Sequence, residues 1–254
     1  MKIGFYDSGL GGLTILKAVR DAMPQYDYVY LGDTANLPFG DKSEEEIYKH
    51  TEKGVRALFE KGALLVIIAC NTASAESLRK IQDGFLHNEY PSRKVLGVII
   101  PTIETLLVAK SKKALLIGTN RTIDSKKYFI ELEKINAKTN LHAIATPALV
   151  PLIEAHDFDS AFLELQNALH EVVGEVDTLI LGCTHYTMLK ELIREAYPEI
   201  QVISQDEIIP EKIKNYLDRH AEIDNLLSRT GSIEVLLTKE STHYDKIKNS
   251  FFNV

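Results

Sequence analysis

Short apolar runs alternate with amphipathic helical patterns along most of the chain, and this alternation limits the possible folds more than any other feature. The first helical pattern is a stripe of Leu13, Leu16, Val19 and Met23, which Pro24 ends. Strands that alternate with helices build right-handed β-α-β units, and such units form parallel sheets. We therefore expect an α/β fold. The expected strands are residues 3–6, 28–31, 64–69, 95–100, 114–117, 141–145 and 179–181.

The two halves of the chain resemble each other. An apolar strand runs into Cys70 in the first half and into Cys183 in the second, and a helix is expected after each cysteine. Gly4 and Gly97 mark strands that we interpret as the comparable first strands of the two halves. The pattern predicts two pseudo-symmetric α/β domains with mainly parallel sheets and an active site in the cleft between them.

We place the domain boundary near the loop of residues 87–93. The first domain is then expected to comprise residues 1–94 and 206–254, and the second domain residues 95–205. The C-terminal segment contains helical stretches and one further strand candidate over residues 231–237. We expect this segment to pack back on the first domain.

Composition and charge exclude several classes of protein. Apolar residues make up 45% of the 254 residues and charged residues 26%, which excludes a disordered or fibrous chain. No apolar run approaches the roughly 18 residues that span a bilayer, and Asp7 interrupts the N-terminal apolar stretch before a signal-peptide core can form. We therefore expect a cytoplasmic protein. The net charge of −7 argues against nucleic acid or an anionic membrane as the main partner.

Five polar loops fall at the expected carboxyl ends of strands, where open parallel sheets bind their ligands. They are rich in hydroxyl groups and in small residues that expose backbone N–H groups, which suits a small carboxylate better than a dinucleotide. The first loop lacks both the ending of a P-loop and the spacing of a dinucleotide fingerprint, so nucleotide binding is not expected. The loops are residues 7–12, 32–40, 70–74, 118–122 and 183–186.

Cys70 and Cys183 are the only cysteines of the chain. Buried core thiols are the usual explanation for free cysteines, and the absence of a Cys-x-x-Cys pair argues against a zinc site or a redox centre. Each thiol, however, lies at an expected helix start, where the N-terminal field lowers a thiol pKa, and polar residues follow both. Two equivalent thiols across a cleft would form an acid–base pair on opposite sides of one substrate. Inversion of a stereocentre by proton transfer needs such a pair, and it requires no metal or organic cofactor.

Two further residues beside the cysteine loops are open to two interpretations. Asp7 is either a turn-forming or N-cap residue, or a group that sets the protonation of Cys70. His185 is either an exposed residue at a helix start or a proton partner of Cys183.

With these residues identified, the sequence resembles the glutamate racemases within the wider aspartate/glutamate racemase superfamily. The resemblance covers most of the chain. Its motifs are DSGLGG at residues 7–12, ACNTAS at 69–74, Gly118-Thr119 with Thr122, VPLIE at 150–154 and GCTHY at 182–186.

The resemblance implies a cofactor-independent interconversion of L- and D-glutamate by two thiols, which supplies D-glutamate for peptidoglycan. It also implies a homodimer. By the family pattern, Cys70 deprotonates the D enantiomer with help from Asp7 and Glu154, and Cys183 deprotonates the L enantiomer with help from His185. The implied substrate contacts are Ser8, Pro38, Phe39, Gly40, Asn71, Thr72, Thr119, Thr122 and Thr184.

Other functions stay open at this point. A racemase that acts on aspartate or another acidic amino acid by the same chemistry would differ only in the depth of its pocket. A thiol-dependent decarboxylase or isomerase of the same superfamily would be expected to alter one cysteine site. A non-catalytic protein that binds small carboxylates would not need paired thiols.

The second loop departs from the family at Asn36 and Phe39, where Arg and Tyr are usual.

Overall fold

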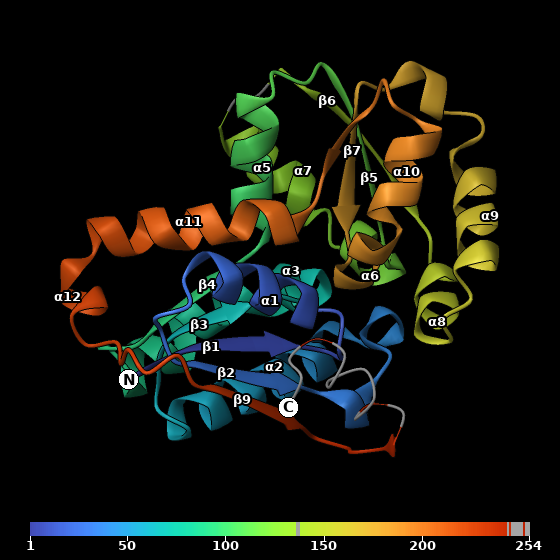
Figure 1. The fold of residues 1–254 in the computed structure, drawn as a ribbon. Coiled ribbons are helices and arrows are strands. Elements are labelled where there is room, and N and C mark those ends of the chain that lie inside the picture. The colour runs from blue at the N-terminus through green and yellow to red at the C-terminus, as the bar shows by residue number, and fades with distance from the viewer. Residues whose placement is uncertain (136–137, 243, 245–250, 252–254) are drawn as a thin grey trace.

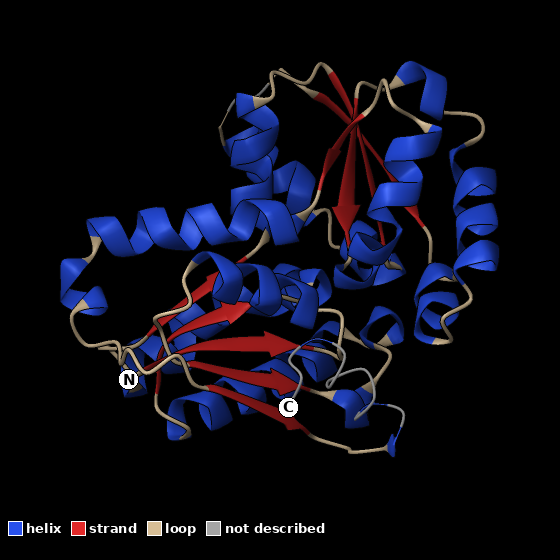
Figure 2. Ribbon diagram, viewed as in Figure 1, coloured by secondary structure: helices blue, strands red, loops and turns tan. Residues whose placement is uncertain are grey.

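The structure is a computed structural model that describes residues 1–135, 138–242, 244 and 251. Within this part of the chain, two parallel sheets form the centres of two lobes (Figures 1 and 2). The strands of each sheet alternate with helices, so the α/β fold predicted from the alternating pattern is confirmed. No helix in the described ranges is long and apolar enough to cross a membrane.

The first lobe has the strand order β4-β3-β1-β2-β9, with every pairing parallel. Apolar side chains fill both faces of this sheet, with α1 and α11 on one face and α2 and α3 on the other. The helix α2 begins at the capping box that Ser43 and Glu46 form. The elements are β1 (Lys2–Asp7), α1 (Leu13–Ala22), β2 (Tyr28–Gly32), α2 (Glu44–Glu60), β3 (Ala63–Ile68), α3 (Asn71–Ile81), α4 (His87–Glu89), β4 (Lys94–Gly97) and β9 (Ile233–Leu237).

The second lobe has the strand order β6-β5-β7-β8, again parallel throughout. The helices α5 and α7 cover one face of this sheet, and α8, α9 and α10 cover the other. The elements are α5 (Ile99–Val108), β5 (Lys113–Gly118), α6 (Asn120–Asp124), α7 (Lys127–Lys134), β6 (Asn140–Ala145), α8 (Leu149–Glu154), α9 (Phe158–Leu169), β7 (Thr178–Gly182), α10 (Lys190–Ala196) and β8 (Gln201–Ile203).

The strand that we expected to open the second domain belongs to the first sheet. β4 pairs with β3, from Leu65 opposite Lys94 to Ile68 opposite Gly97. The order β2-β1-β3-β4 in the first sheet therefore matches β6-β5-β7-β8 in the second. The predicted match between the strands of Gly4 and Gly97 was wrong by one strand. Gly97 ends β4 of the first sheet, and the strand of the second sheet that matches β1 is β5. An apolar run in the sequence does not reveal which sheet it joins. The strands β3 and β7, which precede Cys70 and Cys183, hold the same place in these two orders, as the sequence predicted.

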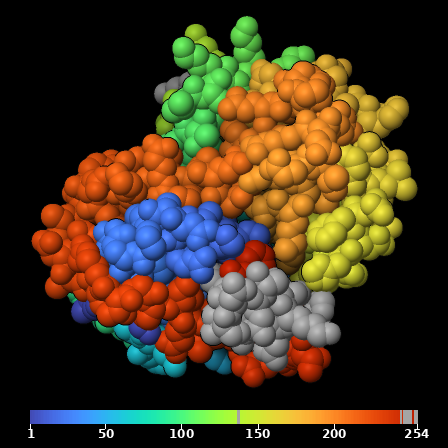
Figure 3. Space-filling view, in the orientation of Figure 1, coloured from blue at the N-terminus to red at the C-terminus, as the bar shows by residue number. Residues whose placement is uncertain are grey.

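The chain passes from the first lobe to the second through α5, and it returns through α11 (Gln205–Arg219) and α12 (Ala221–Asp224) to β9. In the space-filling view, α11 lies directly against α1 (Figure 3). Residues 243, 245–250 and 252–254 of the expected first domain lie outside the described residues.

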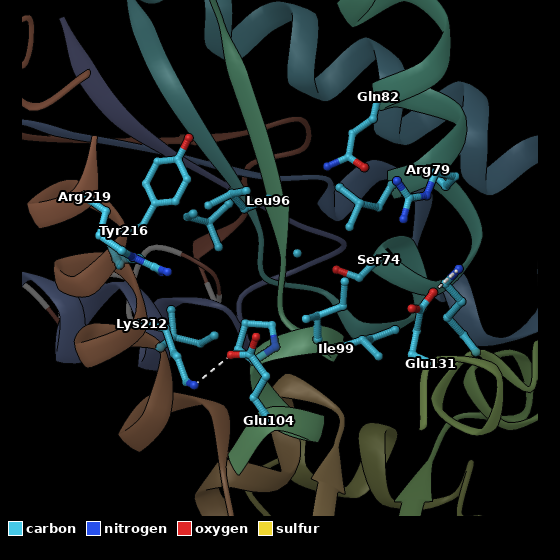
Figure 4. A pocket seen from close by; sticks show the side chains of 18 residues that line it. Ser74, Arg79, Gln82, Leu96, Ile99, Glu104, Glu131, Lys212, Tyr216 and Arg219 are labelled. Atoms are coloured by element: carbon cyan, nitrogen blue, oxygen red, sulfur yellow. Dashed lines mark hydrogen bonds and ion pairs between the residues drawn. The ribbon is translucent and has the colours of Figure 1, made fainter. Parts of the chain in front are cut away.

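A hollow of about 230 Å³ lies where these connections meet α3 (Figure 4). Its walls are largely apolar side chains from α3, β4, α5 and α11. Ion pairs of 2.8 Å, Lys212 Nζ to Glu104 Oε2 and Lys127 Nζ to Glu131 Oε1, lie among the residues that line it. The hollow marks the joint between the two lobes.

Candidate active site

A cavity of about 270 Å³ is lined by loops that follow the strands of both sheets. In parallel sheets these loops gather at one edge, which explains why segments so distant in sequence meet there. The lining residues are Ser8, Leu37, Pro38, Phe39, Gly40, Asp41, Cys70, Asn71, Thr72, Thr119, Asn120, Pro147, Val150, Pro151, Glu154, Cys183, Thr184, His185 and Tyr244. All the predicted site residues are in this set except Asp7 and Thr122.

Cys70 lies at the N-terminus of α3, directly after β3. Its Sγ accepts a hydrogen bond from the Ala73 N–H at 3.4 Å and donates one to Ser8 Oγ at 3.4 Å. Burial raises the pKa of Cys70 to about 12, and the negative charge of Asp7 adds to the rise. At neutral pH the Cys70 sulfur therefore carries its proton and can act as an acid.

Cys183 follows β7, and its surroundings differ from those of Cys70. A 3-10 helix, Thr184–Leu189, comes next rather than an α-helix. Cys183 Sγ lies 3.7 Å from His185 Nδ1, and His185 Nε2 lies 3.1 Å from Glu154 Oε1. The three side chains form a line from thiol to imidazole to carboxylate.

His185 carries a positive charge at neutral pH. Burial lowers its pKa, but the hydrogen bonds and charges of Cys183 and Glu154 outweigh this effect and raise the pKa to about 10. The side chain is buried, which excludes the interpretation as an exposed residue at a helix start. A positive imidazolium thus lies beside Cys183 Sγ, whereas the charge that acts on Cys70 is the negative one of Asp7. The two thiols therefore face the same cavity in opposite electrostatic settings.

The position of Glu154 corrects one implication of the family resemblance. Glu154 was expected to assist Cys70, together with Asp7. Its carboxylate instead contacts His185 and so lies on the Cys183 side. The only sequence signal was its place in residues 150–154, and a segment alone does not reveal which thiol it faces.

Asp7 lies behind the cavity wall rather than in it. Its Oδ2 accepts hydrogen bonds from the N–H groups of Gly9 at 3.1 Å and Gly12 at 3.2 Å. Its Oδ1 accepts one from the Thr184 hydroxyl at 3.4 Å, which joins the first lobe to the second. Burial raises the pKa of Asp7, and the charge of His185 is the main opposing effect. Asp7 thus shapes the glycine-rich turn, and it acts on Cys70 through its charge.

Three threonine hydroxyls join the lobes beside the cavity. Thr72 Oγ1 lies 3.0 Å from both Thr119 Oγ1 and Thr122 Oγ1, and these last two are 3.1 Å apart. Thr119 also caps α6 by accepting a hydrogen bond from the Thr122 N–H. Thr72 and Thr119 line the cavity, whereas Thr122 supports them from behind.

Some lining residues were not singled out from the sequence. Asn120 lies in the loop of residues 118–122, which the rule that ligands bind at strand ends identified as a segment. Pro147 follows the end of β6, where the same rule would have found it. Tyr244 reaches the cavity from the C-terminal segment, for which the sequence contains no comparable signal. Among the residues that the structure describes, no three His, Cys, Asp or Glu side chains gather closely enough to hold a metal ion.

Two thiols at equivalent strand ends of the two α/β lobes line one small cavity, as in no other part of the described chain's sheets. The chain belongs to the Asp/Glu/Hydantoin racemase family, whose model matches residues 14–208. It is an amino-acid racemase, and hence an isomerase.

Relatives and solved structures agree with this family over nearly the whole chain. The chain is 36% identical to the protein named glutamate racemase of Aquifex aeolicus over 250 residues, 97% of this chain and 92% of that one. The crystal structure of a glutamate racemase isoform of Bacillus anthracis matches with a TM-score of 0.88 at 28% identity, and covers 100% of this chain and 94% of that one. A glutamate racemase of Francisella tularensis, solved in complex with D-glutamate, matches with a TM-score of 0.87 at 26% identity and the same coverage.

The contact between His185 and Glu154 generates a first prediction. Replacing Glu154→Gln removes the negative charge 3.1 Å from His185 Nε2, so the pKa of His185 falls below its wild-type value of about 10. The imidazolium is then lost at a lower pH than in the wild type. A histidine NMR titration between pH 6 and 11 measures both values.

The matched control is Glu222→Gln, which removes the carboxylate 3.0 Å from the exposed His220. This control leaves the His185 titration unchanged. Equal His185 midpoints in wild type and Glu154→Gln would show that Glu154 does not hold the charge on His185.

Proposed function

We propose that this protein interconverts L- and D-glutamate by means of two thiols and without a cofactor. The observation that carries the proposal is that Cys70 and Cys183, at matching strand ends of the two sheets, line the same cavity. Glutamate as the substrate is supported by the near full-length relatives that are named glutamate racemases, at 33–39% identity.

The size and lining of the cavity fit a small dicarboxylate. Its volume of about 270 Å³ is below the range of roughly 300–1,000 Å³ of clefts that bind drug-sized ligands. The hydroxyls of Ser8, Thr72, Thr119 and Thr184 and the N-terminus of α3 offer hydrogen-bond donors to carboxylate oxygens.

Proton transfer runs from one face of the α-carbon to the other. With L-glutamate, the Cys183 thiolate takes the α-proton, and the electron pair left on carbon takes the proton of the Cys70 thiol on the opposite face. The step ends with Cys183 protonated, Cys70 as the thiolate and D-glutamate in the cavity. With D-glutamate the same transfers run in reverse.

The charges around the two thiols favour the conversion of L-glutamate to D-glutamate as the first reaction. Cys70 is a protonated acid, because burial and Asp7 raise its pKa to about 12. Cys183 lies beside the charged imidazole of His185, which favours a negative sulfur. The reverse direction needs the Cys70 thiolate, and the substrate ammonium group supplies a positive charge that favours it.

The family resemblance supports three further proposals. The D-glutamate produced serves peptidoglycan synthesis, the enzyme acts in the cytoplasm, and it functions as a homodimer.

The activity is tested by hydrogen exchange at the α-carbon. The purified protein, without added cofactor, is incubated in deuterated water with each enantiomer of glutamate and of aspartate. We expect the α-proton NMR signal of glutamate to disappear while the optical rotation decays to zero. Exchange and inversion of aspartate alone would assign a different substrate, and no change with either would favour a binding protein.

The thiols are tested separately. Cys70→Ser and Cys183→Ser each leave one face of the α-carbon without a competent acid or base, so the rate of racemisation falls by about 10²–10⁴-fold. Polarimetry with each enantiomer measures the rate, and thermal unfolding verifies that each variant is folded. A folded variant that inverts glutamate at nearly the wild-type rate would show that its cysteine is a packing residue.

A further inference from the structure

A group of four buried polar side chains surrounds Asn71, the first residue of α3. Asn71, Thr102, Tyr128 and Gln205 each expose no more than 2% of their surface. Of these four, Asn71 alone lines the cavity. The other three lie on α5, α7 and α11, and neither proton transfer nor substrate contact as described above uses them.

The hydrogen bonds converge on the carboxamide of Asn71. The Tyr128 hydroxyl donates to Asn71 Oδ1 at 2.6 Å, and Gln205 Nε2 donates to the same oxygen at 3.3 Å. Asn71 Nδ2 donates in turn to Gln205 Oε1 at 3.3 Å. Both lone pairs of Asn71 Oδ1 are thereby engaged, so the orientation of the carboxamide is determined from behind the cavity.

The same group joins both connections between the lobes. Gln205 is the first residue of α11, where the chain leaves the second sheet, and its Nε2 lies 3.4 Å from Thr102 Oγ1 on α5 and 3.4 Å from the Tyr128 hydroxyl. Asn71 directly follows Cys70, whose Sγ caps the same helix. The group therefore links the second lobe to the turn that carries the Cys70 thiol.

We infer that Tyr128 and Gln205 are positioning residues for the racemisation. They hold the Asn71 carboxamide and the first turn of α3, and so fix the place of Cys70 relative to the substrate. Proton transfer is sensitive to such placement, because a shift of about 1 Å in a reacting group can cost two orders of magnitude in rate. The inference rests on the proposed function.

Tyr128→Phe tests the inference, because it removes the shortest bond of the group and retains the ring. The matched control is Tyr28→Phe. Tyr28 is equally buried, and its hydroxyl donates at 2.6 Å to the backbone oxygen of Met23, away from the cavity. We expect kcat/KM to fall about tenfold in Tyr128→Phe and to change less than twofold in Tyr28→Phe.

A second readout separates positioning from a general loss of structure. Cys70 takes the α-proton only from the D enantiomer, whereas it returns a proton to carbon when the L enantiomer reacts. The primary deuterium isotope effect on kcat therefore rises for 2-deutero-D-glutamate in Tyr128→Phe and does not rise for the L form. Thermal unfolding of both variants controls for stability. Kinetics and isotope effects of Tyr128→Phe equal to those of Tyr28→Phe would overturn the inference.

A third readout does not depend on the substrate. Iodoacetamide alkylates both thiols, and peptide mass spectrometry gives the rate at Cys70 relative to that at Cys183. We expect this ratio to change at least about threefold in Tyr128→Phe and to stay constant in Tyr28→Phe. If the wild type does not racemise glutamate, the proposed function fails, and this ratio alone still decides whether Tyr128 positions Cys70. An unchanged ratio would overturn the inference.

Discussion

The burial of two thiols at the carboxyl ends of β3 and β7 is the constraint on which the rest of the structure depends. Parallel pairing places both strand ends at the edges from which the cavity is lined. Burial and the nearby Asp7 keep Cys70 protonated, whereas Cys183 lies beside the charged His185, which Glu154 supports. Two thiols with different charged neighbours thus face one cavity from opposite lobes, the arrangement on which the proposed inversion of a carbon centre rests.

Much of the fold could be predicted from the sequence, because hydrophobic periodicity reports directly on strands and helices. The alternating pattern predicted the α/β class, and the apolar stripe that begins at Leu13 and stops before Pro24 predicted α1. Strand pairing is different, since it depends on contacts between distant segments. Residues 95–97 form an apolar run that suits either sheet. We expected this run in the second domain, whereas it pairs with β3 in the first sheet.

The candidate site likewise has a part that the sequence predicts and a part that depends on contacts between distant segments. The rule that ligands bind at strand ends identified most of the lining loops, including those of Cys70 and Cys183. It identifies an edge of the sheet but not the direction of a side chain, so Asp7 proved to lie behind the wall. Tyr128 and Gln205 lie on helices and act through Asn71, and no motif predicts such a contact.

The most direct test of the two-thiol account is a crystal structure of the protein with D-glutamate bound. The account predicts that the α-carbon lies between the sulfur atoms of Cys70 and Cys183, on opposite faces and within about 3.5 Å of each. A complex in which the α-carbon approaches only one sulfur, or in which glutamate binds outside the cavity, would contradict it.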